Sequence, residues 1–345
     1  MRKVTRTGPL AGLLGLLVGA TVLAGCGGTS SAGAPSITLY NGQHVQTTDA
    51  LVNAFEKQTG IQVNVRSDDE DVFANQIVQE GARSPADVIY TENSPPLEFL
   101  RERGLLSGVD GSTLATVAPQ YSSPRRDWVG VSARSSVLVY NTGLLKADQV
   151  PRSVMDLAQP RWRGKLAIAP GETDFQPIVT SIAVRYGKAA ALAWLQAVKA
   201  NAASHTYPSN EILTDMINRG QATIGIINHY YWYRLSAEVG AAAVHSAIAY
   251  FSPGDAGWVI DVSGAAVLRS SPHQQAAQRF VAFLVSRAGE EIIARSQSYE
   301  YPLGSGVSTA QDLRPFDTLH PAPVSVAQLG DGSAAIALLQ QAQLL

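Results

Sequence analysis

Residues 127–141 read DWVGVSARSSVLVYN, and this stretch decides the fold. It is rich in β-branched residues and has no helix-like period, so it predicts an unusually long strand. In an α/β protein, a strand of this length indicates a connection that crosses from one lobe to another. A second such stretch, GWVIDVSGAAVL at 257–268, is expected to carry the chain back.

Strands and helices alternate on both sides of the first crossover. A predicted helix at 47–60 lies between strands at 36–41 and 61–67, and a short buried strand follows at 86–92. Between the crossovers, strands and helices are expected at 165–170, 175–187, 188–200 and 222–228. Such alternation predicts parallel α/β layers. We therefore expect two α/β lobes, 36–134 with 262–318 and 135–261 with 319–345, and a ligand site in the cleft between them.

The N-terminus has the pattern of a secretory signal. Basic residues precede an apolar run from Leu10 to Leu23, and small residues follow it. A membrane-spanning anchor is the alternative, but the run is shorter than the ~20 apolar residues that a spanning helix needs. Leu23-Ala24-Gly25-Cys26 resembles the lipobox of bacterial lipoproteins, which implies a signal at 1–25 and lipid on Cys26. The Gly/Ser-rich stretch at 26–35 is then a flexible tether.

Charge argues against a nucleic-acid partner. Without residues 1–25 the chain has 23 basic and 28 acidic residues, for a formal charge of about −5. No run of five basic residues occurs, whereas nucleic-acid-binding domains usually concentrate Lys and Arg on one face. A mildly acidic protein is compatible with cationic ligands.

The stretch NHYYWY at 228–233 places four aromatic rings directly after a predicted buried strand. The strand ends at Asn228, and HYYWYRLSAEVG is expected to be a helix closed by Gly240. Tyr230 and Tyr231 then lie at the carboxyl end of a strand, facing the cleft. From the residues alone, three interpretations stay open: core packing, a platform for a sugar or a cation, and metal ligation through phenolates.

Phenolate ligation requires a hard, highly charged cation, because a free phenol has a pKa near 10. Ferric ion meets this requirement, since hard cations prefer oxygen donors. Such a site also takes a carboxylate and tolerates an imidazole. Both types occur after other predicted strands, with Glu92 after ADVIYT and His44 after ITLYNGQ. Tyr40 and Tyr90 lie near these ligand-bearing loops and are expected to form cleft walls.

These residues belong to a wider resemblance. ITLYNGQH, GARSPADVIYTE, DWVGVSARSSVLVYN, INHYYW, SGAAVL and EYPL resemble, in order, the motifs of the periplasmic ferric-ion-binding proteins, the bacterial transferrins of iron ABC transporters. The resemblance runs from Ile37 to the C-terminal helices. It implies a two-lobed periplasmic-binding-protein fold of the class II type, which binds Fe³⁺ and is not an enzyme.

In that family, a histidine and a glutamate from the first lobe and two adjacent tyrosines from the second hold ferric iron. The histidine that ends YNGQH is His44, and the glutamate after SPADVIYT is Glu92. The tyrosine pair before Trp232 is Tyr230 and Tyr231. The resemblance therefore implies these four residues as the metal ligands. Two phenolates and one carboxylate would neutralise a trivalent ion.

Family members often complete the iron shell with a bound anion such as phosphate. The positions matched to anion or supporting contacts are Asn93, Arg134, Asn210 and Asn228. The small-residue loop that holds the anion is different here, because APGETDF supplies Glu172, Thr173 and Asp174. Two carboxylates should repel phosphate and supply oxygen themselves, while carbonate stays open as an anion. The alternative for Glu172 or Asp174 is that it caps the following helix.

The predicted function is capture of ferric iron by a monomer, anchored by lipid on the extracytoplasmic face of the cell membrane, and delivery to an ABC permease and its ATPase. One alternative is the same fold with an organic cation such as thiamine or a polyamine, which would not need His44 and Glu92 together with a tyrosine pair. An extracytoplasmic metallohydrolase is a third hypothesis. The sequence has no HExxH, GxSxG or GxGxxG motif to support it.

Overall fold

The structure is a computed structural model that describes residues 35–304, 306–309 and 313–345. The predicted signal, the tether and Cys26 lie outside these residues. The strands are β1 (Ser36–Gly42), β2 (Gln62–Ser67), β3 (Val88–Thr91), β4 (Val129–Asn141), β5 (Leu166–Ala167), β6 (Ile224–Asn228), β7 (Ser246–Ala249), β8 (Ile260–Val267) and β9 (Tyr301–Pro302).

The helices of the first part of the chain are α1 (Val45–Thr59), α2 (Glu70–Glu80), α3 (Pro95–Glu102) and α4 (Gly111–Leu114). The middle of the chain forms α5 (Phe175–Tyr186), α6 (Lys188–Ala202), α7 (Asn210–Asn218) and α8 (His229–Val239). The remaining helices are α9 (Gln274–Leu284), α10 (Arg287–Arg295), α11 (Val326–Leu329) and α12 (Ser333–Gln341). No helix among the described residues combines the length and apolar character needed to cross a membrane.

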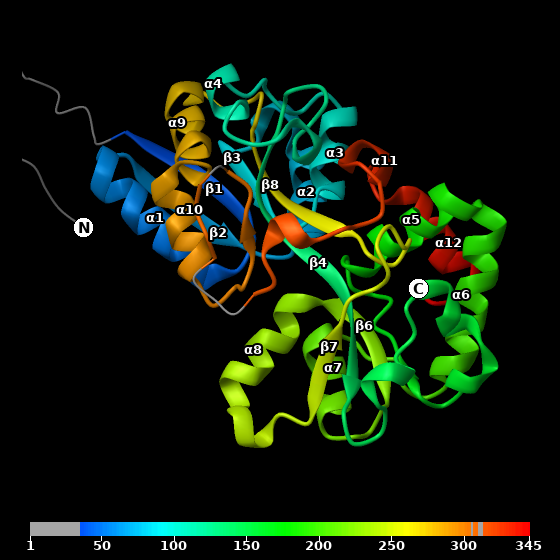
Figure 1. Ribbon diagram of the computed structural model, residues 1–345. Helices are drawn as coiled ribbons and strands as arrows, with labels where there is room; N and C mark the ends of the chain where they lie inside the picture. The colour runs from blue at the N-terminus through cyan, green and yellow to red at the C-terminus, as the bar shows by residue number, and fades with distance from the viewer. Residues whose placement is uncertain (1–34, 305, 310–312) are drawn as a thin grey trace, which may run out of the picture. The chain divides into compact units, whose positions relative to one another are not determined.

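The first sheet region follows the predicted alternation. β1 pairs in parallel with β2 and β3, and β3 pairs antiparallel with β8. Helix α1 buries Leu51, Val52 and Phe55, and ends where Gly60 adopts a left-handed φ of 71°. That conformation is easy for glycine because it has no Cβ. Figure 1 shows α9 and α10 beside α1, so residues far apart in sequence cover this part of the sheet.

The long strand β4 connects the two sheet regions, as DWVGVSARSSVLVYN predicted. Its first half pairs with β8, and its second half pairs antiparallel with β6 and β7. β5 then extends the sheet in parallel with β6. Every residue of β4 is buried, which explains its nearly continuous apolar and small-residue composition. In Figure 1, β4 runs from the region of β1, β3 and β8 toward β6 and β7.

The predicted second crossover is also confirmed, because β8 returns along β4 in antiparallel register. Beyond it, the C-terminal helices α11 and α12 pack on α5, and α12 also contacts α6 (Figure 1). After β8, the chain therefore forms α9 and α10 beside α1, and later α12 beside α5 and α6. The chain therefore passes between the two sheet regions more than once, as expected of two lobes joined by crossover strands.

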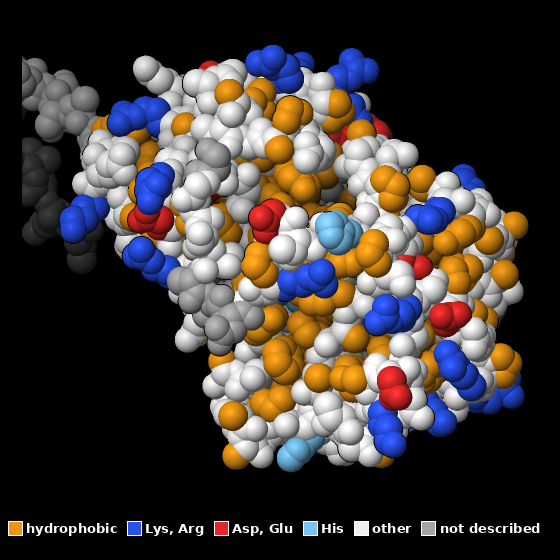
Figure 2. Space-filling view, in the orientation of Figure 1, with side chains coloured by type: hydrophobic (Ala, Val, Ile, Leu, Met, Phe, Trp, Pro, Cys, Tyr) orange, Lys and Arg blue, Asp and Glu red, His pale blue; other side chains and the backbone are white. Residues whose placement is uncertain are grey.

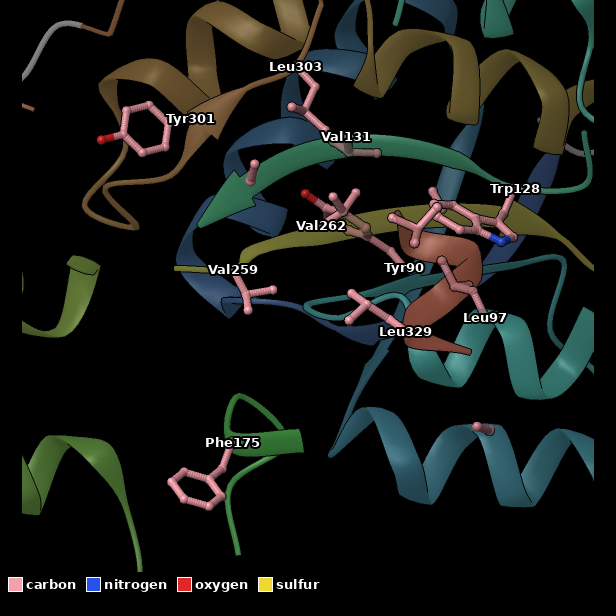
Figure 3. Packing of buried hydrophobic residues seen from close by; sticks show 14 of the residues in the cluster. Tyr90, Leu97, Trp128, Val131, Phe175, Val259, Val262, Tyr301, Leu303 and Leu329 are labelled. Carbon is pink, nitrogen blue, oxygen red and sulfur yellow. The ribbon is translucent and has the colours of Figure 1, made fainter. Parts of the chain in front are cut away.

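Apolar side chains from β3, β4 and β8 form one core. Figure 3 shows Tyr90, Trp128, Val131 and Val262 around these strands. Tyr40 and Tyr90, which were expected to form cleft walls, are both completely buried. They belong to strands β1 and β3, and the Tyr40 ring stacks on Phe73 of α2.

Candidate metal centre

His44 and Glu92 meet because their strands are neighbours. β1 and β3 are parallel, so the residues that follow them emerge at the same edge of the sheet. The His44 Nδ1 atom lies 3.0 Å from the Glu92 Oε1 atom. The two side chains are only 14% and 22% exposed, which leaves a small opening toward solvent.

Tyr230 and Tyr231 occupy the first turn of α8, directly after β6 ends at Asn228. Their rings stack with centroids 4.0 Å apart, although side chains of adjacent helical residues normally diverge. The Tyr230 ring lies edge-on to the His44 ring at 5.2 Å. The Tyr230 ring at the start of α8 and the His44 ring directly before α1 are therefore neighbours in the structure.

One ring nitrogen of His44 is available to a metal ion. The Nδ1 atom lies at hydrogen-bond distance, 3.0 Å, from Glu92 Oε1. The other ring nitrogen of His44, Nε2, is buried and has no hydrogen-bond partner among the described residues. Within the same residues, no group of three His, Cys, Asp or Glu side chains is arranged to hold a metal. A metal here therefore needs the phenol oxygens.

Burial disfavours the charged forms of the four side chains when no cation is bound. It raises the pKa of Tyr230 and Tyr231 well above 10, with further contributions from neighbouring acidic groups. Burial also raises the pKa of Glu92 well above 4.5, although the nearby positive charge of Arg134 opposes the shift. The pKa of His44 falls to about 4, again mainly because of burial. The cluster therefore holds protons that a bound cation would have to displace.

Arg134 lies at the centre of the polar contacts. It comes from the middle of β4, is fully buried, and donates to the main-chain oxygen of Glu92. Its Nη2 atom lies 2.6 Å from Asn93 Oδ1 and 3.4 Å from Asp174 Oδ1. Its Nη1 atom lies 3.3 Å from Glu300 Oε1. One guanidinium thus connects the loop that carries Glu92 to the acidic loop and to the C-terminal part of the chain.

The acidic loop is held in place by asparagines. The Glu172 Oε1 atom accepts from the Asn210 main-chain N–H at 3.1 Å, and the Asn210 side-chain amide lies 3.5 Å from Asp174 Oδ2. The Asn93 amide donates to Thr173 Oγ1 at 3.0 Å. Although Asp174 precedes α5, its side chain makes no capping hydrogen bond to that helix. The capping alternative therefore does not describe Asp174.

The remaining predicted anion contact, Asn228, is buried at the end of β6. Beside it, Asp261 of β8 lies opposite Arg134 in the strand register. Burial raises the pKa of Asp261 to about 7, and the charge of Asp174 adds to the shift. The sequence analysis missed this carboxylate, because one acid inside an apolar strand gives no spacing signal.

Glu300 and Gln43 were also missed. Glu300 is 1% exposed, and besides Arg134 it contacts Ser132 Oγ and the Gln43 side-chain amide. Its sequence context, EYPL, was used only as a family motif. For Gln43, the sequence offered one signal: it directly precedes the predicted ligand His44.

Two hollows flank His44. One, of about 460 Å³, is lined by the loop after β1, the start of α2, and Glu92, Glu172 and Thr173. The other, of about 630 Å³, lies between α1, α8 and α10. The first joins the histidine–glutamate pair to the acidic loop and gives a cation an approach lined by carboxylates. On the face drawn in Figure 2, Lys and Arg side chains lie in separate small groups.

The chain is similar to proteins of known function along nearly its whole length. Residues 83–323 match the family described as bacterial extracellular solute-binding protein. The chain is 36% identical to the Fe(3+)-binding periplasmic protein of Serratia marcescens, with 99% of each chain covered. It is also 36% identical to the major ferric iron-binding protein of Neisseria meningitidis, covering 89% of this chain and 92% of the relative.

Solved structures agree with the predicted fold class. Iron-bound HitA from Pseudomonas aeruginosa superposes with a TM-score of 0.83 and 39% identity, covering 89% of this chain and 99% of that one. A Trichodesmium protein (IdiA, FutA), solved with iron and citrate ligands, gives a TM-score of 0.80 at 29% identity, with 89% and 99% covered. The names of these relatives describe iron binding and not catalysis, so the expectation of a non-enzymatic protein is confirmed. The chain belongs to the bacterial extracellular solute-binding protein family, together with the periplasmic ferric-ion-binding proteins.

Proposed function

We propose that this protein captures ferric iron between His44 and Glu92 on one side and Tyr230 and Tyr231 on the other. The observation that carries the proposal is the convergence of these side chains from three separate strand ends. His44 lies 3.0 Å from Glu92 between donor atoms and 5.2 Å from Tyr230 between ring centroids. The relatives named for Fe(3+) binding support the same cargo.

The chemistry of the donors selects a hard trivalent cation. Two phenolates and one carboxylate carry three negative charges, and the burial of the cluster makes an uncompensated charge costly. Ferric ion neutralises all three, whereas a divalent ion would leave one buried negative charge. The neutral imidazole of His44 adds a donor without changing this balance.

We further propose that Asp174 and Glu172 replace the external anion. The contacts of Asp174 with Arg134 and Asn210 support this, because an anion at that place would need the same donors. The carboxylate already pairs with the guanidinium at 3.4 Å, so a phosphate would have to displace it and face its charge. Iron binding should therefore proceed without added phosphate.

The transport steps complete the proposal. The lobes, 36–134 with 262–318 and 135–261 with 319–345, close around the ion by a hinge movement through β4 and β8. The loaded protein, a monomer held to the membrane by lipid on Cys26, then docks on an ABC permease. The extracellular solute-binding family and its periplasmic members support this extracytoplasmic setting.

Iron titration of the soluble domain tests the cargo, with visible absorption as the readout. A tyrosinate-to-iron charge-transfer band should grow to one equivalent, with the same affinity with and without phosphate and carbonate. The Tyr230→Phe, Tyr231→Phe double variant should lose the band. A colourless iron-loaded protein, or an unchanged band in the double variant, would show that the phenols are not ligands.

A further inference from the structure

We propose that Glu300 is a positioning residue that aligns both His44 and Glu92 for the metal. The proposal rests on the proposed function, because it describes how the same site is held. Glu300 contacts neither donor atom itself. It acts through Gln43 on one side and through Arg134 on the other, and it is 1% exposed, so its partners are fixed by the protein and not by solvent.

The backbone fixes Glu300 beside the crossover strand. It directly precedes β9, whose Tyr301 and Pro302 pair with Ala133 and Ser132 of β4. The residue before it, Tyr299, adopts a φ of 54°, in the left-handed region that side chains other than glycine rarely occupy. This unfavourable conformation turns the chain so that the Glu300 carboxylate enters the polar core, and such strain persists where its surroundings enforce it.

The first branch leads to His44. The Gln43 side-chain amide donates to both carboxylate oxygens of Glu300 at 3.3 Å and to Ser263 at 2.9 Å. With its amide nitrogen held there, the Gln43 carbonyl oxygen accepts the His44 main-chain N–H at 2.7 Å. The orientation of Gln43, and with it the place where α1 begins, thus depends on the Glu300 carboxylate.

The second branch leads to Glu92. The Arg134 guanidinium lies 3.3 Å from Glu300 and donates to the main-chain oxygen of Glu92. Arg134 thus holds the main chain of Glu92 and not its carboxylate, which lies against His44. Glu300 also balances the charge of Arg134, which would otherwise repel a trivalent cation nearby.

Other acidic groups around this arrangement do not duplicate Glu300. Asp174 faces the opposite nitrogen of Arg134, at 3.4 Å, and belongs to the acidic loop. Asp261 lies opposite Arg134 in the strand register. Only Glu300, among the described residues, contacts both Gln43 and Arg134. The Ser132 hydroxyl donates a further hydrogen bond to the Glu300 carboxylate, at 2.8 Å.

The test compares Glu300→Gln with a matched control, Glu290→Gln. Glu290 is also 1% exposed, but its carboxylate accepts from the main chain of Gly304 and contacts neither Gln43 nor Arg134. Supporting residues of metal ligands typically change metal affinity by ~10–100-fold. For Glu300→Gln we expect a ~10–100-fold loss of ferric affinity and a shifted charge-transfer band. For Glu290→Gln we expect unchanged affinity and an unchanged band.

A second readout requires no metal. In ¹⁵N NMR spectra of the iron-free protein, Glu300→Gln should shift the His44 and Asn93 amide signals and speed hydrogen exchange at the His44 N–H. Glu290→Gln should leave both signals in place. Unshifted signals in Glu300→Gln would overturn the proposal. So would equal loss of affinity in both variants. If the unmodified protein bound no iron, the proposed function would fail, while these spectra would still decide whether Glu300 positions His44.

Discussion

Ferric affinity should fall steeply as pH decreases, because iron binding must expel protons from Tyr230 and Tyr231. Burial raises the pKa of both phenols well above 10, so both are protonated at neutral pH. Each displaced proton changes the binding constant about tenfold per pH unit, or about 1.4 kcal/mol. Two phenols therefore predict about a hundredfold loss of affinity, about 2.7 kcal/mol, for each unit of acidification.

Glu92 makes the dependence of the logarithm of ferric affinity on pH, the slope, steeper in part of the pH range. Its pKa also lies well above 4.5 because of burial, so wherever its carboxyl is still protonated a third proton must leave. The pKa of His44 is about 4, so at neutral pH the imidazole is already free of its second proton and adds nothing to the slope. The expected slope is therefore between two and three protons per iron.

The assay is competition for ferric ion between the protein and citrate between about pH 6 and pH 8, followed by the charge-transfer band and corrected for protonation of the citrate. Tyr230→Phe and Tyr231→Phe should each lower the slope by one proton. Tyr186→Phe is the control, because Tyr186 is 44% exposed on α5, and its slope should equal that of the unmodified protein. A slope near zero, or an unchanged slope in both cleft variants, would refute the reasoning.

Three further predictions concern the acidic loop, a buried carboxyl and a close backbone contact. Asp174→Ala should bind iron ~10–100-fold more weakly, and added phosphate should restore part of the affinity in a parallel titration. Burial raises the pKa of Glu70 to about 8, so the native state binds a proton that the unfolded state lacks. This proton makes stability fall by up to about 1.4 kcal/mol per pH unit between pH 6 and pH 8. In urea unfolding of the iron-free protein, Glu70→Gln should therefore show a shallower pH dependence by that amount. A Cβ at Gly130 would lie 2.1 Å from the Tyr121 carbonyl oxygen, so Gly130→Ala should lower the free energy of unfolding by about 3 kcal/mol. The control is Gly171→Ala, which should unfold like the unmodified protein because no atom lies within 4 Å of its added Cβ.

Much of the fold could be predicted because its signals are local. The long strand at 129–141 and the return strand at 260–267 lie inside the stretches identified from β-branched composition. Helix α1 ends at Gly60 and α8 at Gly240, as the glycine positions predicted. The two helices α5 and α6 were also predicted as separate elements, with Gly187 between them.

The supporting shell of the site could not be predicted, because its contacts join residues with no sequence proximity. Gln43 and Glu300 are 257 positions apart, and Arg134 and Glu300 are 166 positions apart. Strand pairing between β9 and β4 brings the glutamate into place, and that pairing has only two residues of regular strand. The stacking of Tyr230 on Tyr231 could not be predicted either, because side chains of adjacent helical residues normally diverge.

The composition of the buried cluster links iron binding to protonation. Glu92, Asp174, Asp261 and Glu300 are carboxylic acids that surround one buried cation, Arg134. One guanidinium cannot compensate several buried carboxylates. Burial therefore raises the pKa of Glu92 well above 4.5 and that of Asp261 to about 7. Protons and a trivalent cation therefore compensate the same negative charge. Ferric iron should stabilise the protein more at high pH, where fewer protons are present to compete with it.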